Sequence, residues 1–182
     1  RNRLWAWTAL AWSIGILLFG VVQRERAESV YRSFVATRGH TPDTVEVKPS
    51  FGNNILFRGF YAHEGKYWAD AVRVPWWGES RVYAGEQAEI LDWDKTTTGA
   101  EELHVADLKR FAHFSNGYLI HDPKNPDIVA DFRYAMLPNT VAPLWGVDFG
   151  GAEPGKHINF HRYSRVSSET RTVFWDQLMG RP

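Results

Sequence analysis

The chain has 182 residues, of which 44% are hydrophobic and 23% charged, a composition typical of a folded protein rather than a disordered one. Its 21 basic and 21 acidic residues balance, so it lacks the positive field that nucleic-acid binding needs. The absence of cysteine excludes disulfides, thiolate metal sites and cysteine nucleophiles. We therefore expect one domain, with at most an appendage, and no nucleic-acid partner.

Residues 4–22 form an uncharged apolar stretch with arginines on both sides. About 20 apolar residues in a helix cross the roughly 30 Å hydrocarbon core of a bilayer, and Trp5 and Trp7 are placed for the membrane interface. A signal peptide has a shorter apolar run and a small-residue cleavage site, and a helix buried in a soluble core rarely stays apolar on every face. Residues 1–23 are thus predicted to be a transmembrane helix in contact with the lipid bilayer.

Residues 24–39 predict that the same helix continues as an amphipathic connecting segment. Apolar residues between positions 27 and 35 recur at helical spacing and form one stripe, while the other faces are charged. The charges are of mixed sign, which favours packing on the following domain over lying on lipid headgroups. Gly39 is suited to end the helix.

Residues 40–182 predict an extramembrane α+β domain, a mostly antiparallel sheet with two further helices on one face. Residues 78–99 show little periodicity and predict a long loop. Thr98 and Glu101 form the pattern of a capping box for the next helix, and Ser168 is placed to cap a last helix ending at Gly180. Alternating or β-branched runs predict strands at residues 44–50, 54–62, 66–75, 118–121, 128–135, 145–149 and 156–163.

Several short motifs follow one another along residues 49–147: PSFGNNILFR, GKY, RFAHFSNGY, DFRY, LPN and PLWGV. Together, over residues 4–150, they resemble the C-terminal part of the bacterial membrane-bound metal-dependent hydrolase family, the YdjM/YbcI type of inner membrane protein. The resemblance implies several upstream membrane helices with a histidine-containing metal site. This chain lacks that motif, so no catalytic residue is assigned to it. A divalent metal, zinc or manganese, is expected to bind upstream rather than to this segment.

Two histidines offer a metal site within the chain itself. His157, Asn159 and His161 would project from one face of a strand. Two imidazoles so spaced bind zinc if a carboxylate such as Asp148 or Glu153 approaches. The alternative, an exposed strand face with two ordinary histidines, is favoured because no carboxylate stands at a fixed ligand spacing.

Arginines offer anion contacts. Asp131 and Arg133 would share a strand face, where Asp131 holds Arg133 for a substrate anion beside Tyr134. A structural pair that fixes the register is the favoured alternative. Arg58 lies among apolar residues and needs a partner when buried, and the sequence leaves three acidic residues open: Asp70, Asp131 and Glu46.

Trp76 and Trp77 follow a proline at the end of the predicted hairpin. Two interpretations remain open: the indoles enter the membrane interface, or they cover the core at the end of the hairpin.

Two functions remain. The chain is the last span and extramembrane domain of a protein resembling the metal-dependent hydrolases, associated with upstream helices of the same protein or with a membrane partner. Alternatively, it is a non-enzymatic, membrane-anchored interaction or assembly domain. The chain holds no complete catalytic constellation. Localisation in the bacterial inner membrane is expected, and four arginines after the span against two before it favour a cytoplasmic domain.

Overall fold

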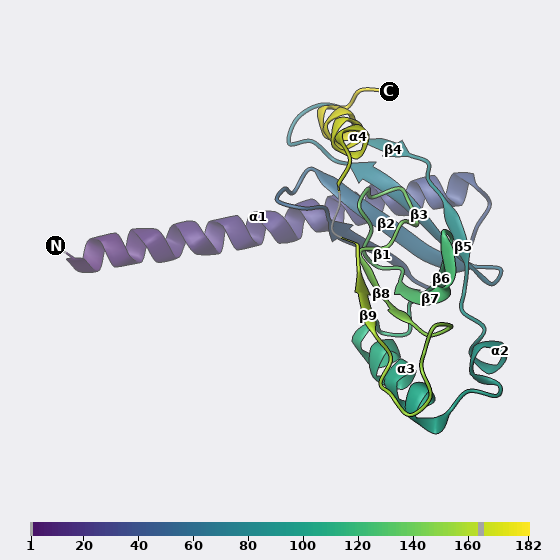
Figure 1. Ribbon diagram of the computed structural model, residues 1–182. Coiled ribbons are helices and arrows are strands. Elements are labelled where there is room, and N and C mark those ends of the chain that lie inside the picture. The colour runs from purple at the N-terminus through teal and green to yellow at the C-terminus, as the bar shows by residue number, and fades with distance from the viewer. Residues whose placement is uncertain (1, 164–165) are drawn as a thin grey trace.

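A computed structural model describes residues 2–163 and 166–182. Over these residues one long helix is followed by two antiparallel sheets and three shorter helices (Figure 1). The predicted α+β class is confirmed, with one helix more than expected.

Helix α1 (Asn2–Thr37) runs unbroken through both the apolar and the amphipathic segments. Its N-terminal half extends away from the sheets, and its C-terminal half lies along them (Figure 1). The helix ends where Gly39 takes a positive φ of 75° and its N–H bonds back to the carbonyl of Ala36. Glycine adopts this conformation without the steric cost of a Cβ.

The first sheet contains five strands in the order β1-β2-β3-β4, with β5 also paired to β3. They are β1 (Val45–Pro49), β2 (Leu56–His63), β3 (Lys66–Arg73), β4 (Arg81–Tyr83) and β5 (Gln87–Glu89). Strands β4 and β5 pair with opposite ends of β3, at Arg73–Arg81 and Lys66–Glu89 respectively. The prediction of a long loop over residues 78–99 is therefore wrong, because strands of three residues are too short to show a period.

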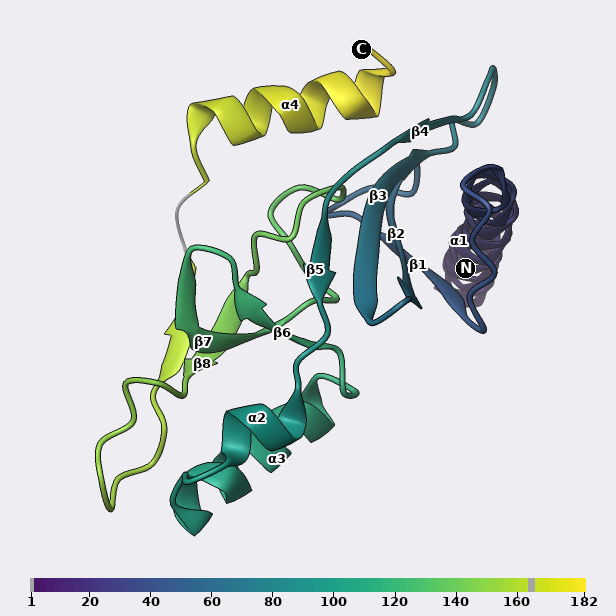
Figure 2. The same ribbon diagram turned by 90° about the vertical axis from the view of Figure 1, so that its right-hand side faces the viewer.

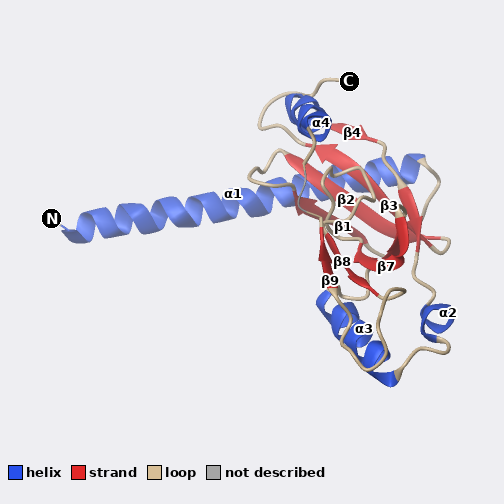
Figure 3. Ribbon diagram, in the orientation of Figure 1, coloured by secondary structure: helices blue, strands red, loops and turns tan. Residues whose placement is uncertain are grey.

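The second sheet has the order β6-β7-β8-β9. Figure 3 shows β7, β8 and β9 in red, near the blue helix α3. Its strands are β6 (Leu119–Asp122), β7 (Asn125–Asp131), β8 (Trp145–Asp148) and β9 (Phe160–Arg162). The predicted strand over residues 156–163 shrinks to β9, and His157 lies outside it. The strand predicted over residues 128–135 is displaced and ends at Asp131.

The remaining helices are α2 (Trp93–Thr97), α3 (Glu102–Phe114) and α4 (Ser168–Met179). The predicted capping box is wrong, since Thr98 closes α2 and Glu101 makes no side-chain cap to α3. Ser167, rather than Ser168, caps α4, and Gly180 ends it as expected. The expectation of helices on one face also fails: α1 lies on the first sheet and α3 beside the second (Figure 2).

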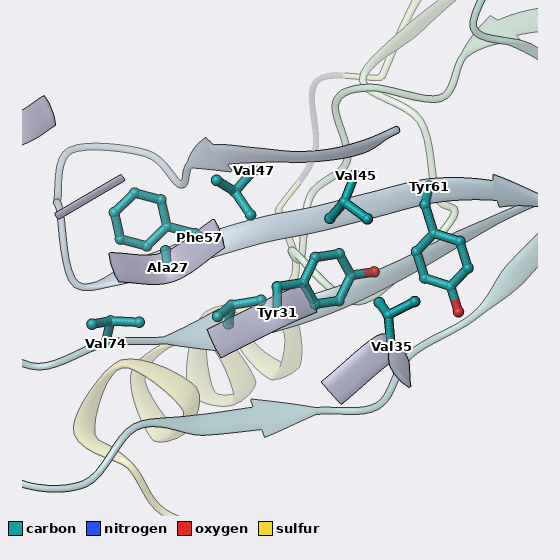
Figure 4. Packing of buried hydrophobic residues seen from close by; sticks show 9 residues of the cluster. Ala27, Tyr31, Val35, Val45, Val47, Phe57, Tyr61 and Val74 are labelled. Atoms are coloured by element: carbon teal, nitrogen blue, oxygen red, sulfur yellow. The ribbon is translucent and has the colours of Figure 1, made fainter. Parts of the chain in front are cut away.

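The main core lies between α1 and the first sheet. Ala27, Tyr31 and Val35 of α1 are fully buried against strand residues of β1–β3 and Val74: Val45, Val47, Phe57, Tyr61, Val72 and Val74 (Figure 4). Each of the valine and phenylalanine side chains among them contributes about 1.5–3 kcal/mol when removed from water. The amphipathic segment therefore packs on the domain, as its mixed charges predicted.

Gly59 of β2 allows the closest approach in this core. A Cβ at this position would lie 2.5 Å from Cε1 of Tyr31. Only glycine lets the tyrosine ring lie flat on the strand, and its hydroxyl thereby reaches the paired strand β3.

Candidate functional site at the junction of helix and domain

The apolar half of α1 is exposed on every side. In the 18-residue window of highest hydropathy, none of the helix is buried within the protein, and α1 is long and apolar enough to cross a membrane. Trp5 and Trp7 lie at its N-terminal end and are 72% and 64% exposed. An exposed apolar surface of this extent marks contact with lipid or with another protein.

The two halves of α1 meet at Gln23, whose side chain is completely buried. Its Nε2 donates to the carbonyls of Asn54 (2.9 Å) and Val74 (3.1 Å). Arg26 donates to the Gln23 side chain and to the carbonyl of Pro75. The first polar residue after the apolar stretch thus ties both the β1–β2 loop and the segment after β3 to the helix.

Aromatic side chains lie on these same two segments. Trp76 packs edge-on against Phe19 of α1, with ring centroids 5.5 Å apart, and Trp77 packs against Trp76. Trp77 is 83% exposed and does not cover the core at the end of the hairpin, whereas Trp76 is half-buried against α1. Together with Thr8, Ala11 and Gly15 they border an apolar groove along α1.

A buried ionic cluster holds the C-terminal half of α1 to the sheet. The Asp70 carboxylate is fully buried and accepts two hydrogen bonds from Arg38, one from the Tyr31 hydroxyl and one from the Gly85 N–H, at 2.7–2.8 Å. Burial, followed by the neighbouring carboxylate, raises the pKa of Tyr31. Burial alone would lower the pKa of Arg38, but its hydrogen bonds to Asp70 and Tyr61 and the charge of Asp70 together outweigh burial and raise it. These four hydrogen bonds occupy both oxygens of the Asp70 carboxylate, which therefore has a structural role.

Arg58 reaches from the first sheet to the segment after β7. Its guanidinium donates to the carbonyls of Pro138 (2.8 Å), Thr140 (2.7 Å) and Phe132 (2.9 Å). Burial lowers its pKa to about 10. The expected pairing with an acidic residue is wrong, because the three candidate carboxylates bind other side chains: Asp70 binds Arg38, Asp131 binds Arg133, and Glu46 binds Tyr118.

Asp131 and Arg133 form the predicted pair, although Arg133 follows the strand rather than lying in it. The guanidinium donates to both carboxylate oxygens and to the carbonyl of Phe114 at the end of α3. These hydrogen bonds raise the pKa of Arg133. Trp145 donates to the same carboxylate, and Tyr134 lies over Arg133 and beside Trp145. The pair joins α3 to the second sheet, which fits the structural interpretation.

The two histidines of the metal hypothesis are held apart by different partners. His157 bonds to Asp107 of α3 at 2.9 Å, whereas the His161 ring packs on Tyr163. Burial alone would raise the pKa of Asp107. The hydrogen bonds from His157 and the Ile158 N–H act in the opposite direction and hold this pKa below its usual value. The proposed third ligands are engaged elsewhere: Asp148 caps Gly151 and Glu153 pairs with Lys156.

Within residues 2–163 and 166–182, no group of three or more histidine, aspartate or glutamate side chains is arranged to hold a metal ion. Sequence reasoning missed Gln23 altogether and considered Asp70 only as one of three possible partners of Arg58. Two signals in the sequence could have found them: Gln23 is a polar residue directly after an apolar run, and Asp70 lies between two alanines in a predicted strand.

Comparison of the chain with protein-family models, with curated proteins and with solved structures finds no match.

Proposed function

We propose that this chain is a non-enzymatic, membrane-anchored interaction domain, in which α1 crosses the bilayer and holds the α+β domain in a fixed position at its surface. One observation carries the proposal: a single unbroken helix is exposed and apolar in one half and forms part of the domain core in the other. The span and the domain would therefore move as one body.

The polar clusters support a structural rather than a catalytic role for the charged residues. The guanidinium groups of Arg58 and Arg133 and the carboxylates of Asp70 and Asp131 are all buried and engaged with other parts of the fold. A catalytic group needs geometry open to a reacting atom. We infer that the domain acts through its surfaces.

Partners within the bilayer are the second part of the proposal. The apolar half of α1 is exposed on every side, so a neighbouring transmembrane helix can pack on a face other than the one beside Trp76. That helix belongs either to an upstream segment of the same protein or to a membrane partner. The arginines that follow the apolar stretch support a cytoplasmic domain in a bacterial inner membrane.

The test is a distance measurement on the full chain in nanodiscs. The chain has no cysteine, so spin labels can be placed at Leu17 in the apolar half and at Glu64 in the β2–β3 turn. We expect a narrow distance distribution, which broadens when Arg24→Pro kinks the helix between the two halves. A broad distribution in the parent chain would contradict rigid coupling. Failure of the chain to remain in the membrane after alkaline carbonate extraction would contradict the span.

A second candidate function is the one implied by the family resemblance, the final span and extramembrane domain of a membrane-bound metal-dependent hydrolase. One observation favours it: motifs far apart in the sequence meet in space, since Arg58 bonds to carbonyls of Phe132, Leu137 and Pro138. The motifs would then define a scaffold that covers a metal site supplied from upstream.

Metal analysis of the chain, purified in detergent without a histidine tag, tests whether this domain itself holds a metal site. We expect no stoichiometric zinc or manganese. Bound metal that is lost in a His157→Ala/His161→Ala variant would place a metal site in this domain and overturn the non-enzymatic proposal.

A further inference from the structure

Three exposed aromatic residues lie at one end of the first sheet, where the β1–β2 loop and the segment after β3 emerge beside α1 (Figures 1 and 2). They are Phe51, Trp76 and Trp77, called here the aromatic patch. Phe51 and Trp77 are 96% and 83% exposed. Sequence reasoning considered the tryptophans but not Phe51, which lies 25 residues earlier in the chain.

The segments that carry the patch are held in place. In the β1–β2 loop, the Asn53 side chain accepts from the N–H groups of Ile55 and Leu56 and donates to Ser50. The indole of Trp76 lies 3.4 Å from the amide oxygen of Asn54, which joins the two segments. The exposed aromatic rings are thus presented by hydrogen-bonded turns, whose backbone is further fixed to α1 through Gln23.

The position of the patch along α1 sets its depth. Trp76 packs against Phe19, which lies three residues before Val22, the last residue of the apolar stretch. At 1.5 Å per residue, this is roughly 4.5 Å on the apolar side of that boundary. If α1 crosses a bilayer, the Trp76 ring lies where acyl chains meet headgroups, the region that tryptophan prefers. Trp77 packs on Trp76, and the loop that carries Phe51 is joined to Trp76 through Asn54.

We infer that the aromatic patch inserts into the bilayer and forms a second contact with lipid, in addition to the contact made by the span. This inference rests on the proposed function, because the depth follows from α1 crossing the membrane. Lipid is the favoured occupant because Trp76 and Trp77 of the patch continue the exposed apolar surface of α1 from Trp12 to Phe19. The contact would fix the tilt of the domain against the membrane, as interfacial aromatic residues do.

The experiment places a single cysteine, carrying the environment-sensitive fluorophore NBD, at each of four positions of the full chain. The positions are Phe51 and Trp77 in the patch, Leu17 in the span, and Glu64 as a control at the opposite end of the β2–β3 hairpin. Each variant is reconstituted in phosphatidylcholine vesicles with or without lipids that carry a nitroxide quencher at a shallow acyl position. We expect blue-shifted, quenched emission at 51 and 77, and water-like, unquenched emission at 64.

The outcomes separate the two proposals. Quenching at position 17 with water-like emission at 51 and 77 would overturn the lipid contact and leave the span intact. Absence of quenching at all of these positions would overturn both. Blue-shifted emission without quenching at 51 and 77 would show that protein covers the patch, and would replace lipid with a protein partner.

In a second measurement the label lies outside the patch, so that the aromatic rings are present in the parent protein and can be removed separately. A label at Glu79, next to the patch in sequence, should shift toward water-like emission when Phe51→Ser and Trp77→Ser are introduced together. The same pair of substitutions should leave the emission of a label at Glu64 unchanged, which controls for unfolding. An unchanged label at 79 would contradict insertion of the patch.

Discussion

The two halves of α1 share one backbone and differ in everything that surrounds them. From Leu4 to Val22 the side chains are apolar on all sides and face outward. From Gln23 onward only one stripe is apolar, and Ala27, Tyr31 and Val35 are buried against the sheet. A continuous helix can therefore pass from an exposed apolar segment to a packed amphipathic one within one turn, provided that the residue at the boundary satisfies the polar groups of the domain.

The largest expected effect tests the ionic attachment of the C-terminal half. Asp70→Asn removes the charge that faces Arg38 and leaves this mostly buried guanidinium without its counter-charge. We expect a loss of about 3 kcal/mol in the free energy of unfolding, the range for breaking one side of a buried pair. Denaturant unfolding in detergent, followed by near-ultraviolet circular dichroism, measures it. Glu89→Gln, which breaks the exposed pair with Lys66, is the control and should cost below about 1 kcal/mol. Equal costs would contradict the structural role of Asp70.

Glycine-to-alanine substitutions test the packing of the two halves of α1 separately. Gly59→Ala places a Cβ 2.5 Å from the Tyr31 ring, and overpacking of this kind costs about 1–3 kcal/mol. Gly20→Ala in the exposed half meets no atom within 4 Å. It should leave stability unchanged or raise it by up to about 1 kcal/mol through helix propensity. The midpoints of thermal unfolding of the two variants distinguish them, and a Gly59→Ala protein as stable as its parent would show that Tyr31 is not held against β2.

At the boundary itself, Gln23→Ala removes the donor shared by the carbonyls of Asn54 and Val74. Leaving buried acceptors without donors should cost about 1–2 kcal/mol. Hydrogen exchange should accelerate in residues 50–55 and 74–78, while the β2–β3 turn keeps its rate. Gln87→Ala on the exposed strand β5 serves as the control. Unaltered exchange in both segments would show that Gln23 does not couple the helix to them.

The smallest effect is a pH dependence at the end of α1. The His40 ring stacks on His63 at 4.1 Å and bonds to the Tyr61 hydroxyl. Burial, followed by the charges of His63 and Arg38, lowers the pKa of His40. The unfolded chain, with a histidine pKa of about 6.5, then binds this proton first as the pH falls. The contribution of His40 to stability is therefore complete above about pH 6.5 and declines below it.

Titration of the imidazole by NMR checks this prediction. The midpoint of His40 should lie below about 6.5 and should rise in His63→Ala, which removes the stacked ring and its charge. His161→Ala, in the second sheet, should leave the midpoint unchanged. A midpoint at or above the ordinary value in the parent protein would contradict the shift.

The sequence predicted the long helix, its division near residue 23 and most strands of the sheets, because these features depend on local periodicity. It did not predict β4, β5 or the separation into two sheets. Those strands have three residues each and exist only because the edge of β3 offers them hydrogen bonds. Within the candidate site, the Asp131–Arg133 pair was predictable because the two residues are neighbours in the chain.

By itself, then, the sequence determined which segments are apolar on one side, on every side or on none, since side-chain solubility and helical or strand spacing suffice for that. Only the tertiary structure decided which groups meet over long separations. Arg58 bonds to carbonyls 74–82 residues away rather than to a carboxylate. The pairing of β1, β2 and β3 brings the loop that carries Phe51 to the same end of the sheet as the segment that carries Trp76 and Trp77. Such contacts follow from strand register and from the close approach that Gly59 allows, and neither leaves a periodic signal in the chain.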